Sequence, residues 1–149
     1  METSRTTLGS SCCDTFAQKV EVELNRAERY RVFVSLTVLD LGPAEGTAGE
    51  RTVEVLQDVA LGVKEAVRTC DQVALLHHNY LAVLLPETPR QGAEVAGRRL
   101  AGIARTKLAA RLGHGADRVI PVEIASYPDT AGARTLNGFL EELARKGQN

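Results

Sequence analysis

The stretch VALLHHNYLAVLLPET, residues 73–88, has the pattern of two short strands joined by a tight polar turn. The second strand, 80–86, is apolar on both of its alternating faces, which is typical of a strand buried in the middle of a sheet. The turn between the strands carries His77 and His78. The pattern therefore predicts a hairpin of strands 72–77 and 80–86, formed by two central strands with the histidines at its tip.

Helix and strand patterns surround this hairpin on both sides. Apolar residues at three- and four-residue spacing predict helices, and β-branched apolar runs predict buried strands. Thr88 as N-cap, Pro89 in the first turn and Gln91 as capping-box partner predict the start of the helix after the hairpin. Pro121 predicts that the last strand lies near an edge of the sheet or carries a bulge. The predicted elements are helix 14–30, strand 31–41, helix 51–68, strands 72–77 and 80–86, helix 88–112, strand 118–127 and helix 133–147.

The order of these elements predicts the fold class. From residue 31 the order is strand, helix, strand, strand, helix, strand, with one further helix at each end. The six inner elements follow the split βαβ, or ferredoxin-like, order. The helices would pack on one face of a mostly antiparallel sheet, which gives an α+β domain. A chain of 149 residues is long enough to bury a core, so we expect one domain over 14–149 after a flexible N-terminus at 1–13.

The composition narrows the class of protein. A chain that is 44% hydrophobic and 25% charged is typical of a soluble globular domain. The net charge of −1 lacks the basic excess of a nucleic-acid-binding protein. The sequence has neither a signal peptide nor a run of about 18 apolar residues, so we expect a cytoplasmic protein without membrane contact. Cys12, Cys13 and Cys70 lack metal-ligand spacing and favour a reducing compartment, and no cofactor is expected.

Four segments, taken together in their order and spacing, resemble the GGDEF domain of diguanylate cyclases. They are ELNRAERYRVFVSLTVLDL (23–41), RTCDQVALLHHNYLAVLLPET (68–88), ASYPD (125–129) and ARKGQN (144–149). The resemblance runs from about residue 14 to residue 149 and implies a GGDEF-like, nucleotidyl-cyclase-like fold. Members of this family condense two GTP molecules into cyclic di-GMP across a dimer in bacterial second-messenger signalling. A metal held by carboxylates organises the reacting groups.

The resemblance also implies that the catalytic site has degenerated. The family's signature pentad, two glycines followed by acids, falls on His77, His78, Asn79, Tyr80 and Leu81. The glycines let the turn approach the nucleotide without side chains, and two imidazoles would crowd that space. Asn79 has no charge to offer a metal. The signature that carries the chemistry is therefore replaced.

Other positions of the same site have changed as well. Asp40 matches the first metal-binding aspartate, but Gly42 stands where a second acid is usual. The family's nucleotide-binding aspartate, lysine and arginine fall on Val53, Ala144 and Gln148. We therefore expect a vestigial active site, with no metal and no catalytic residue, at Asp40, His77, His78, Asn79 and Tyr80.

A second site of the family is matched by residues that remain. Arg68 and Asp71 have the spacing of an arginine-x-x-aspartate motif that binds the product, and Arg99 matches an arginine on the following helix. Guanidinium groups can fork onto a phosphate or a guanine edge, and Asp71 could accept hydrogen bonds from guanine. The resemblance therefore implies a cyclic di-GMP site at these three residues. A structural interpretation stays open, because Arg68 suits the helix dipole and Arg99 could be a solvated surface residue.

The histidines and the domain each leave alternatives open. His77 and His78 fit an exposed turn without function, a contact with a partner, or, together with Asp40, a weak transition-metal site. The domain fits three functions. The first is a non-catalytic signalling module that binds cyclic di-GMP, contacts a protein partner or forms a homodimer. The second is a weak or altered cyclase, and the third is a structural interaction domain without a small ligand.

Overall fold

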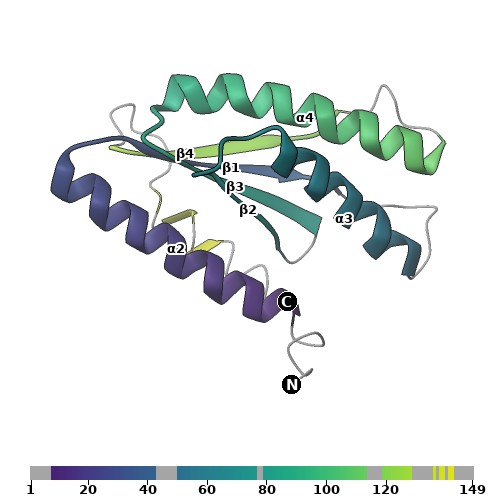
Figure 1. The fold of residues 1–149 in the computed structure, drawn as a ribbon, viewed down its shortest axis with the longest axis horizontal. Helices are drawn as coiled ribbons and strands as arrows, with labels where there is room; N and C mark the ends of the chain where they lie inside the picture. Colours follow the sequence, from purple (N-terminus) through teal and green to yellow (C-terminus); the bar gives the residue numbers. More distant parts are fainter. Residues whose placement is uncertain are drawn as a thin grey trace.

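The structure is a computed structural model that describes residues 8–42, 50–76, 79–113, 119–128, 136, 138–139 and 141–142. Figure 1 shows its four strands as one sheet with helices on both sides. The main helices are α2 (Leu8–Tyr30), α3 (Glu50–Glu65) and α4 (Arg90–Leu112). The strands are β1 (Val34–Asp40), β2 (Gln72–Leu75), β3 (Tyr80–Pro86) and β4 (Val122–Tyr127).

The sheet has the order β2-β3-β1-β4, and each neighbouring pair in it is antiparallel. This confirms the predicted α+β, ferredoxin-like arrangement. β3 is central and buried along most of its length, as its apolar pattern predicts. β4 lies at one edge, which is one of the two alternatives that Pro121 predicts, but the strand begins at Val122, directly after this proline, rather than at residue 118.

The prediction that both hairpin strands are central is wrong for β2. This strand lies at the other edge of the sheet, and its four residues are only half-buried. In a hairpin the two strands pair with each other. The local sequence pattern therefore does not determine which of them also pairs with a further strand and becomes central. That choice is made by the pairing of β3 with β1, a strand far away in the sequence.

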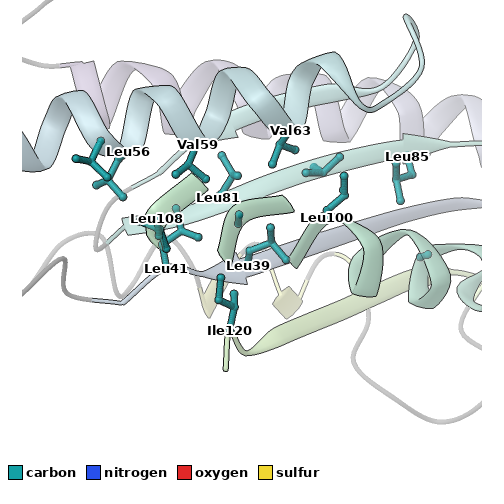
Figure 2. Packing of buried hydrophobic residues seen from close by; sticks show 14 residues of the cluster. Leu39, Leu41, Leu56, Val59, Val63, Leu81, Leu85, Leu100, Leu108 and Ile120 are labelled. Atoms are coloured by element: carbon teal, nitrogen blue, oxygen red, sulfur yellow. The ribbon is translucent and has the colours of Figure 1, made fainter. Parts of the chain in front are cut away.

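Two hydrophobic clusters fill the two faces of the sheet. On one face α3 and α4 cover the side chains of Leu81, Val83 and Leu85, and Figure 2 shows part of this cluster gathered between the helices and the sheet. On the other face α2 covers Ala82 and Leu84. The alternation along β3 sends successive side chains to opposite faces, which explains why both faces of this strand are apolar.

The prediction that the helices share one face therefore holds for α3 and α4 and is wrong for α2. In Figure 1 α2 lies on the side of the sheet opposite to α3 and α4. Its buried residues Phe16, Val20, Leu24 and Ala27 form the predicted apolar stripe. That stripe predicts only that the helix is covered on one side. α2 packs on the second face of the sheet because α3 and α4 already cover the first.

Several boundaries differ from the predicted ones. α2 begins at Leu8 rather than at Asp14, so residues 8–13, expected to be flexible, are helical. Serine and cysteine are only weakly unfavourable in a helix, and an existing helix extends at low cost. α3 ends at Glu65 rather than at residue 68. The backbone N–H groups of Ala66 and Val67 donate to carbonyls three residues back, and the backbone N–H of Arg68 donates to the side chain of Asp71, so the helical pattern ends.

The start of α4 does not use the predicted cap. The N-cap residue is Pro89, which makes no side-chain cap hydrogen bond. The hydroxyl of Thr88 donates to the carbonyl of Pro86 instead, at 2.9 Å. The predicted end is confirmed, since α4 ends at Leu112 and Gly113 follows in the left-handed conformation that favours glycine.

Two further observations complete the fold. Leu136 and Phe139 are buried in the cluster on the α2 face, but most of the helix predicted over 133–147 lies outside the described residues. Over the part of the chain that the structure describes, no helix combines the length and the apolar character that a membrane span needs.

Candidate functional site

Arg68, Asp71 and Arg99 line one pocket of about 420 Å³. We call this cavity the α3–α4 pocket, because it lies where α3 has ended and α4 has begun. Arg68 and Asp71 come from the turn between α3 and β2, and Arg99 comes from α4. The structure thus brings together the three residues that the sequence predicts as one site. The remaining lining residues are Ala66, Val67, Leu85, Thr88, Gly92 and Ala96.

Arg68 and Asp71 form a closed local unit. The guanidinium of Arg68 donates to both carboxylate oxygens, from Nε to Oδ2 at 3.2 Å and from Nη2 to Oδ1 at 2.9 Å. The backbone N–H of Arg68 also donates to Asp71 Oδ2, and the backbone N–H of Asp71 donates to the carbonyl of Arg68. The side chain of Asp71 is only 3% exposed, whereas that of Arg68 is 54% exposed. Asp71 is therefore covered by Arg68, and its oxygens are engaged.

This geometry changes the role expected for Asp71. The resemblance implies a carboxylate that accepts hydrogen bonds from guanine. In the structure its oxygens hold Arg68, so Asp71 orients the guanidinium of a residue that lines the pocket. The hydrogen bond to Asp71 raises the pKa of Arg68, so the guanidinium is always charged.

Arg68 also reaches the end of β3 and the residues after it. Its Nη2 donates to the carbonyl of Pro86 and to Oγ1 of Thr88, both at 2.9 Å. This contact is not predicted from the sequence, because Thr88 has the features of a helix cap. The observed register accounts for the contact: Gln72 pairs with Leu84, and the same register continued beyond the paired strands places Arg68 opposite Thr88.

Arg99 approaches the pocket from α4. Its Nη1 donates to the carbonyl of Ala66 at 3.0 Å, just after α3 has ended. A cation at the carboxyl end of a helix is favourable, because it meets carbonyl groups that have no partner inside the helix. Both arginines thus have structural hydrogen bonds, in accord with the structural interpretation. Their guanidinium groups nevertheless line the same cavity, where they outnumber the single carboxylate.

The vestigial active-site residues that the structure describes meet at the other end of the sheet. Asp40 pairs with Tyr80 across β1 and β3. Oδ1 of Asp40 accepts a hydrogen bond from the backbone N–H of Gly42 at 2.9 Å. Asn79 has a left-handed φ of 62°, and its Nδ2 donates to the carbonyl of Gly42 at 2.8 Å. The side chains of Asp40 and Asn79 therefore both bind the backbone of Gly42.

The corner formed by Asp40, Gly42 and Asn79 has a structural role that is not predicted from the sequence. The amide of Asn79 donates to a carbonyl, which a carboxylate at the same position could not do. His77 and His78 lie outside the described residues, as do Ala144 and Gln148. Within the described ranges, no group of three or more His, Cys, Asp or Glu side chains is placed to hold a metal ion. The two carboxylates expected of a cyclase metal site are not provided by Asp40, Asn79 and Tyr80.

Solved structures with this fold are similar to the chain at low sequence identity. The diguanylate cyclase SiaD of Pseudomonas aeruginosa, solved with its activator SiaC, matches with 23% identity and a TM-score of 0.62 over 90% of this chain. The GGDEF domain of YfiN (TpbB) from the same organism matches with 21% identity and a TM-score of 0.61, over 89% of this chain and 84% of its own. PelD, also from P. aeruginosa, matches with 21% identity and a TM-score of 0.56 over 93% of this chain.

The chain spans 55% of the SiaD chain and 46% of the PelD chain. No protein-family model matches the sequence, and no curated protein matches it. The likeness to the solved structures is therefore one of three-dimensional fold. The expected resemblance is confirmed at that level: over its described residues the chain has the fold of GGDEF domains, with a four-stranded antiparallel sheet between helices.

Proposed function

We propose that this domain is a catalytically inactive signalling module with a GGDEF fold, and that it binds cyclic di-GMP in the α3–α4 pocket. The observation that carries the proposal is the convergence of Arg68, Asp71 and Arg99 on one cavity of about 420 Å³. These residues come from two separate segments of the chain, and only the packing of α4 beside the end of α3 brings them together. The volume is in the range of small-molecule sites.

The chemistry of the pocket suits a cyclic dinucleotide. This ligand has two phosphodiester anions and two guanine bases. Guanidinium groups bind phosphate oxygens through forked hydrogen bonds and also stack on flat rings. Arg68 is held in place by Asp71 before the ligand arrives, so less side-chain entropy is lost on binding. Arg99 supplies a second positive charge from α4.

The corner at Gly42 supports the loss of catalysis. Phosphoryl transfer in this fold needs carboxylates that hold a divalent metal. Of the vestigial residues that the structure describes, only Asp40 is a carboxylate, and it accepts a hydrogen bond from Gly42. Asn79 donates its amide to the same glycine. These side chains do not provide two carboxylates that could coordinate a metal. A receptor function is therefore favoured over a weak cyclase.

A protein contact is the natural output of such a receptor. SiaD, which shares the fold, was solved in complex with an activator protein. We propose that the domain signals through a protein partner or a homodimer, and that cyclic di-GMP modulates this contact.

Titration calorimetry with cyclic di-GMP tests the binding proposal. The wild-type domain should bind, and Arg68→Ala should weaken binding by about ten- to a hundredfold, the loss typical of one charge-assisted contact. Arg68→Lys should also weaken it, because lysine keeps the charge but cannot form the forked contact with Asp71 that orients the guanidinium. Arg99→Ala should weaken binding in the same way, and Arg98→Ala, at the neighbouring position, is its matched control. Both residues are exposed on α4, but only Arg99 lines the pocket.

The catalytic proposal has its own test. The purified domain should make no cyclic di-GMP from GTP with magnesium or manganese. Turnover that disappears in Asp40→Ala would overturn the proposed loss of activity. Absence of heat with cyclic di-GMP at high micromolar concentration would overturn the receptor function and leave a protein-interaction module.

A further inference from the structure

The segment Pro86–Thr88, which begins at the last residue of β3, is held by side chains from both faces of the sheet. From the pocket side, Nη2 of Arg68 donates to the carbonyl of Pro86 and to Oγ1 of Thr88. From the opposite side, Nη2 of Arg26 on α2 donates to Oε2 of Glu87 at 2.7 Å. Three successive residues thus connect the pocket with a helix that lies on the other face of the sheet.

A second contact of α2 has the same placement. Nζ of Lys19 donates to Oε1 of Gln72 at 3.2 Å. Gln72 directly follows Asp71, as Glu87 directly precedes Thr88. Thr88 and Asp71 both line the pocket, and each thus has a sequence neighbour whose side chain contacts α2. Both of these long-range polar contacts of α2 therefore end beside a pocket residue.

We propose that the docking of α2 and the affinity of the α3–α4 pocket are energetically coupled through the ion pair between Arg26 and Glu87. This inference rests on the proposed function, since it makes α2 the regulator of the same ligand site. Arg26 and Glu87 act as positioning residues, because neither lines the pocket.

The backbone of the connecting segment explains how the coupling works. Glu87 has a φ of 53°, a left-handed conformation that non-glycine residues rarely adopt unless their surroundings hold them there. The ion pair with Arg26 holds its side chain. When this pair is lost, the segment can relax, and the acceptors at Pro86 and Thr88 move relative to Arg68. The guanidinium is then less well oriented for a ligand, and affinity falls.

The size of the effect is limited by the ion pair itself. The side chains of Arg26 and Glu87 are 44% and 53% exposed. Exposed pairs contribute modestly, so we expect their loss to weaken ligand binding by about two- to fivefold. Coupling is reciprocal, so bound ligand should hold α2 more firmly on the sheet by the same factor.

The test uses the whole domain with four variants. Arg26→Gln and Glu87→Gln each remove the ion pair. The exchanged variant, Arg26→Glu with Glu87→Arg, rebuilds it with opposite polarity. It also carries Glu23→Gln, because the carboxylate of Glu23 lies 3.6 Å from the guanidinium of Arg26 and would repel a new glutamate there. Arg29→Gln is the matched control, because Arg29 is an exposed residue of the same helix with no ion pair among the described residues. The first measurement is the affinity for cyclic di-GMP. The second is NMR-detected hydrogen exchange of the backbone amides of Arg68 and Asp71 in the ligand-free domain.

The two measurements separate this inference from the proposed function. We expect both single variants to bind cyclic di-GMP two- to fivefold more weakly and to exchange the two pocket amides faster, with the exchanged variant nearer to wild type. Unchanged amide exchange in both single variants would overturn the coupling, even if the wild type binds ligand. An exchanged variant no better than the single variants would overturn the role of the ion pair. If the wild type binds no ligand, the receptor function fails, while faster amide exchange would still support the connection between α2 and the pocket.

Discussion

Asn79→Asp would return an acid to the position where the catalytic signature has lost one. The two side chains have nearly the same shape, and both residues tolerate the left-handed φ of 62° found here. The hydrogen bond from Nδ2 to the carbonyl of Gly42 at 2.8 Å would nevertheless be lost. A carboxylate oxygen would face that carbonyl oxygen instead, close to Asp40, which binds the N–H of the same glycine.

We expect this substitution to lower the free energy of unfolding by about 1–3 kcal/mol, the usual cost of leaving a partly buried hydrogen-bonding group without its partner. The carbonyl oxygen of Gly42 and the carboxylate of Asp40 both disfavour the ionised form of the new aspartate. Its pKa should therefore lie above the unfolded value of about 3.9. For a group with a raised folded pKa, the stabilising effect of the protonated form is present below the unfolded pKa and is lost as pH rises through the folded pKa. The deficit should therefore be largest near about pH 7 and shrink toward about pH 4.

Urea unfolding of wild type and variant at several pH values measures this difference. Asp40→Asn, alone and combined with Asn79→Asp, isolates the repulsion between the two carboxylates in a double-mutant cycle. A variant as stable as wild type at about pH 7, or one whose deficit grows as pH falls, would refute the structural role of Asn79. Restored cyclase activity in Asn79→Asp would refute the view that the metal site has been lost.

Urea unfolding also measures the effect of substitutions in the packed interior. Leu81→Ala and Leu85→Ala should each cost about 2–5 kcal/mol, with Leu85 at the lower end because it borders the α3–α4 pocket and is less enclosed; a larger loss at Leu85 would contradict this. Thr37→Val should stabilise the domain by about 1 kcal/mol, because the hydroxyl of Thr37 is buried without a hydrogen-bond partner among the described residues; a clear loss of stability would reveal an unseen partner. Gly97→Val should destabilise it by about 1–3 kcal/mol, because a Cβ there would already lie 3.0 Å from Val122 Cγ1 on the sheet; a neutral result would mean that α4 can move away.

Much of the fold is readable from local patterns. The apolar run of β3 predicts a strand covered on both faces, and the stripe along α2 predicts which side of that helix is buried. Glycine at position 113 marks the end of α4. These features depend on periodicity and backbone conformation within a few residues. The prediction failed where distant partners decide, as for the edge position of β2 and the placement of α2 on the second face.

The candidate site divides in the same way. The spacing of Arg68 and Asp71 in the sequence indicates that both side chains can face one ligand, whereas the structure shows that they share one short turn and that Arg68 reaches Thr88. Only the tertiary structure decided that Arg99 reaches the carbonyl of Ala66, a residue 33 positions away. The packing of α4 against α3 likewise forms the pocket. At the other end of the sheet, the amide of Asn79 donates to the carbonyl of Gly42. Spacing along a chain specifies which groups can share a turn or a face, whereas the partner of each polar group depends on which elements pack together.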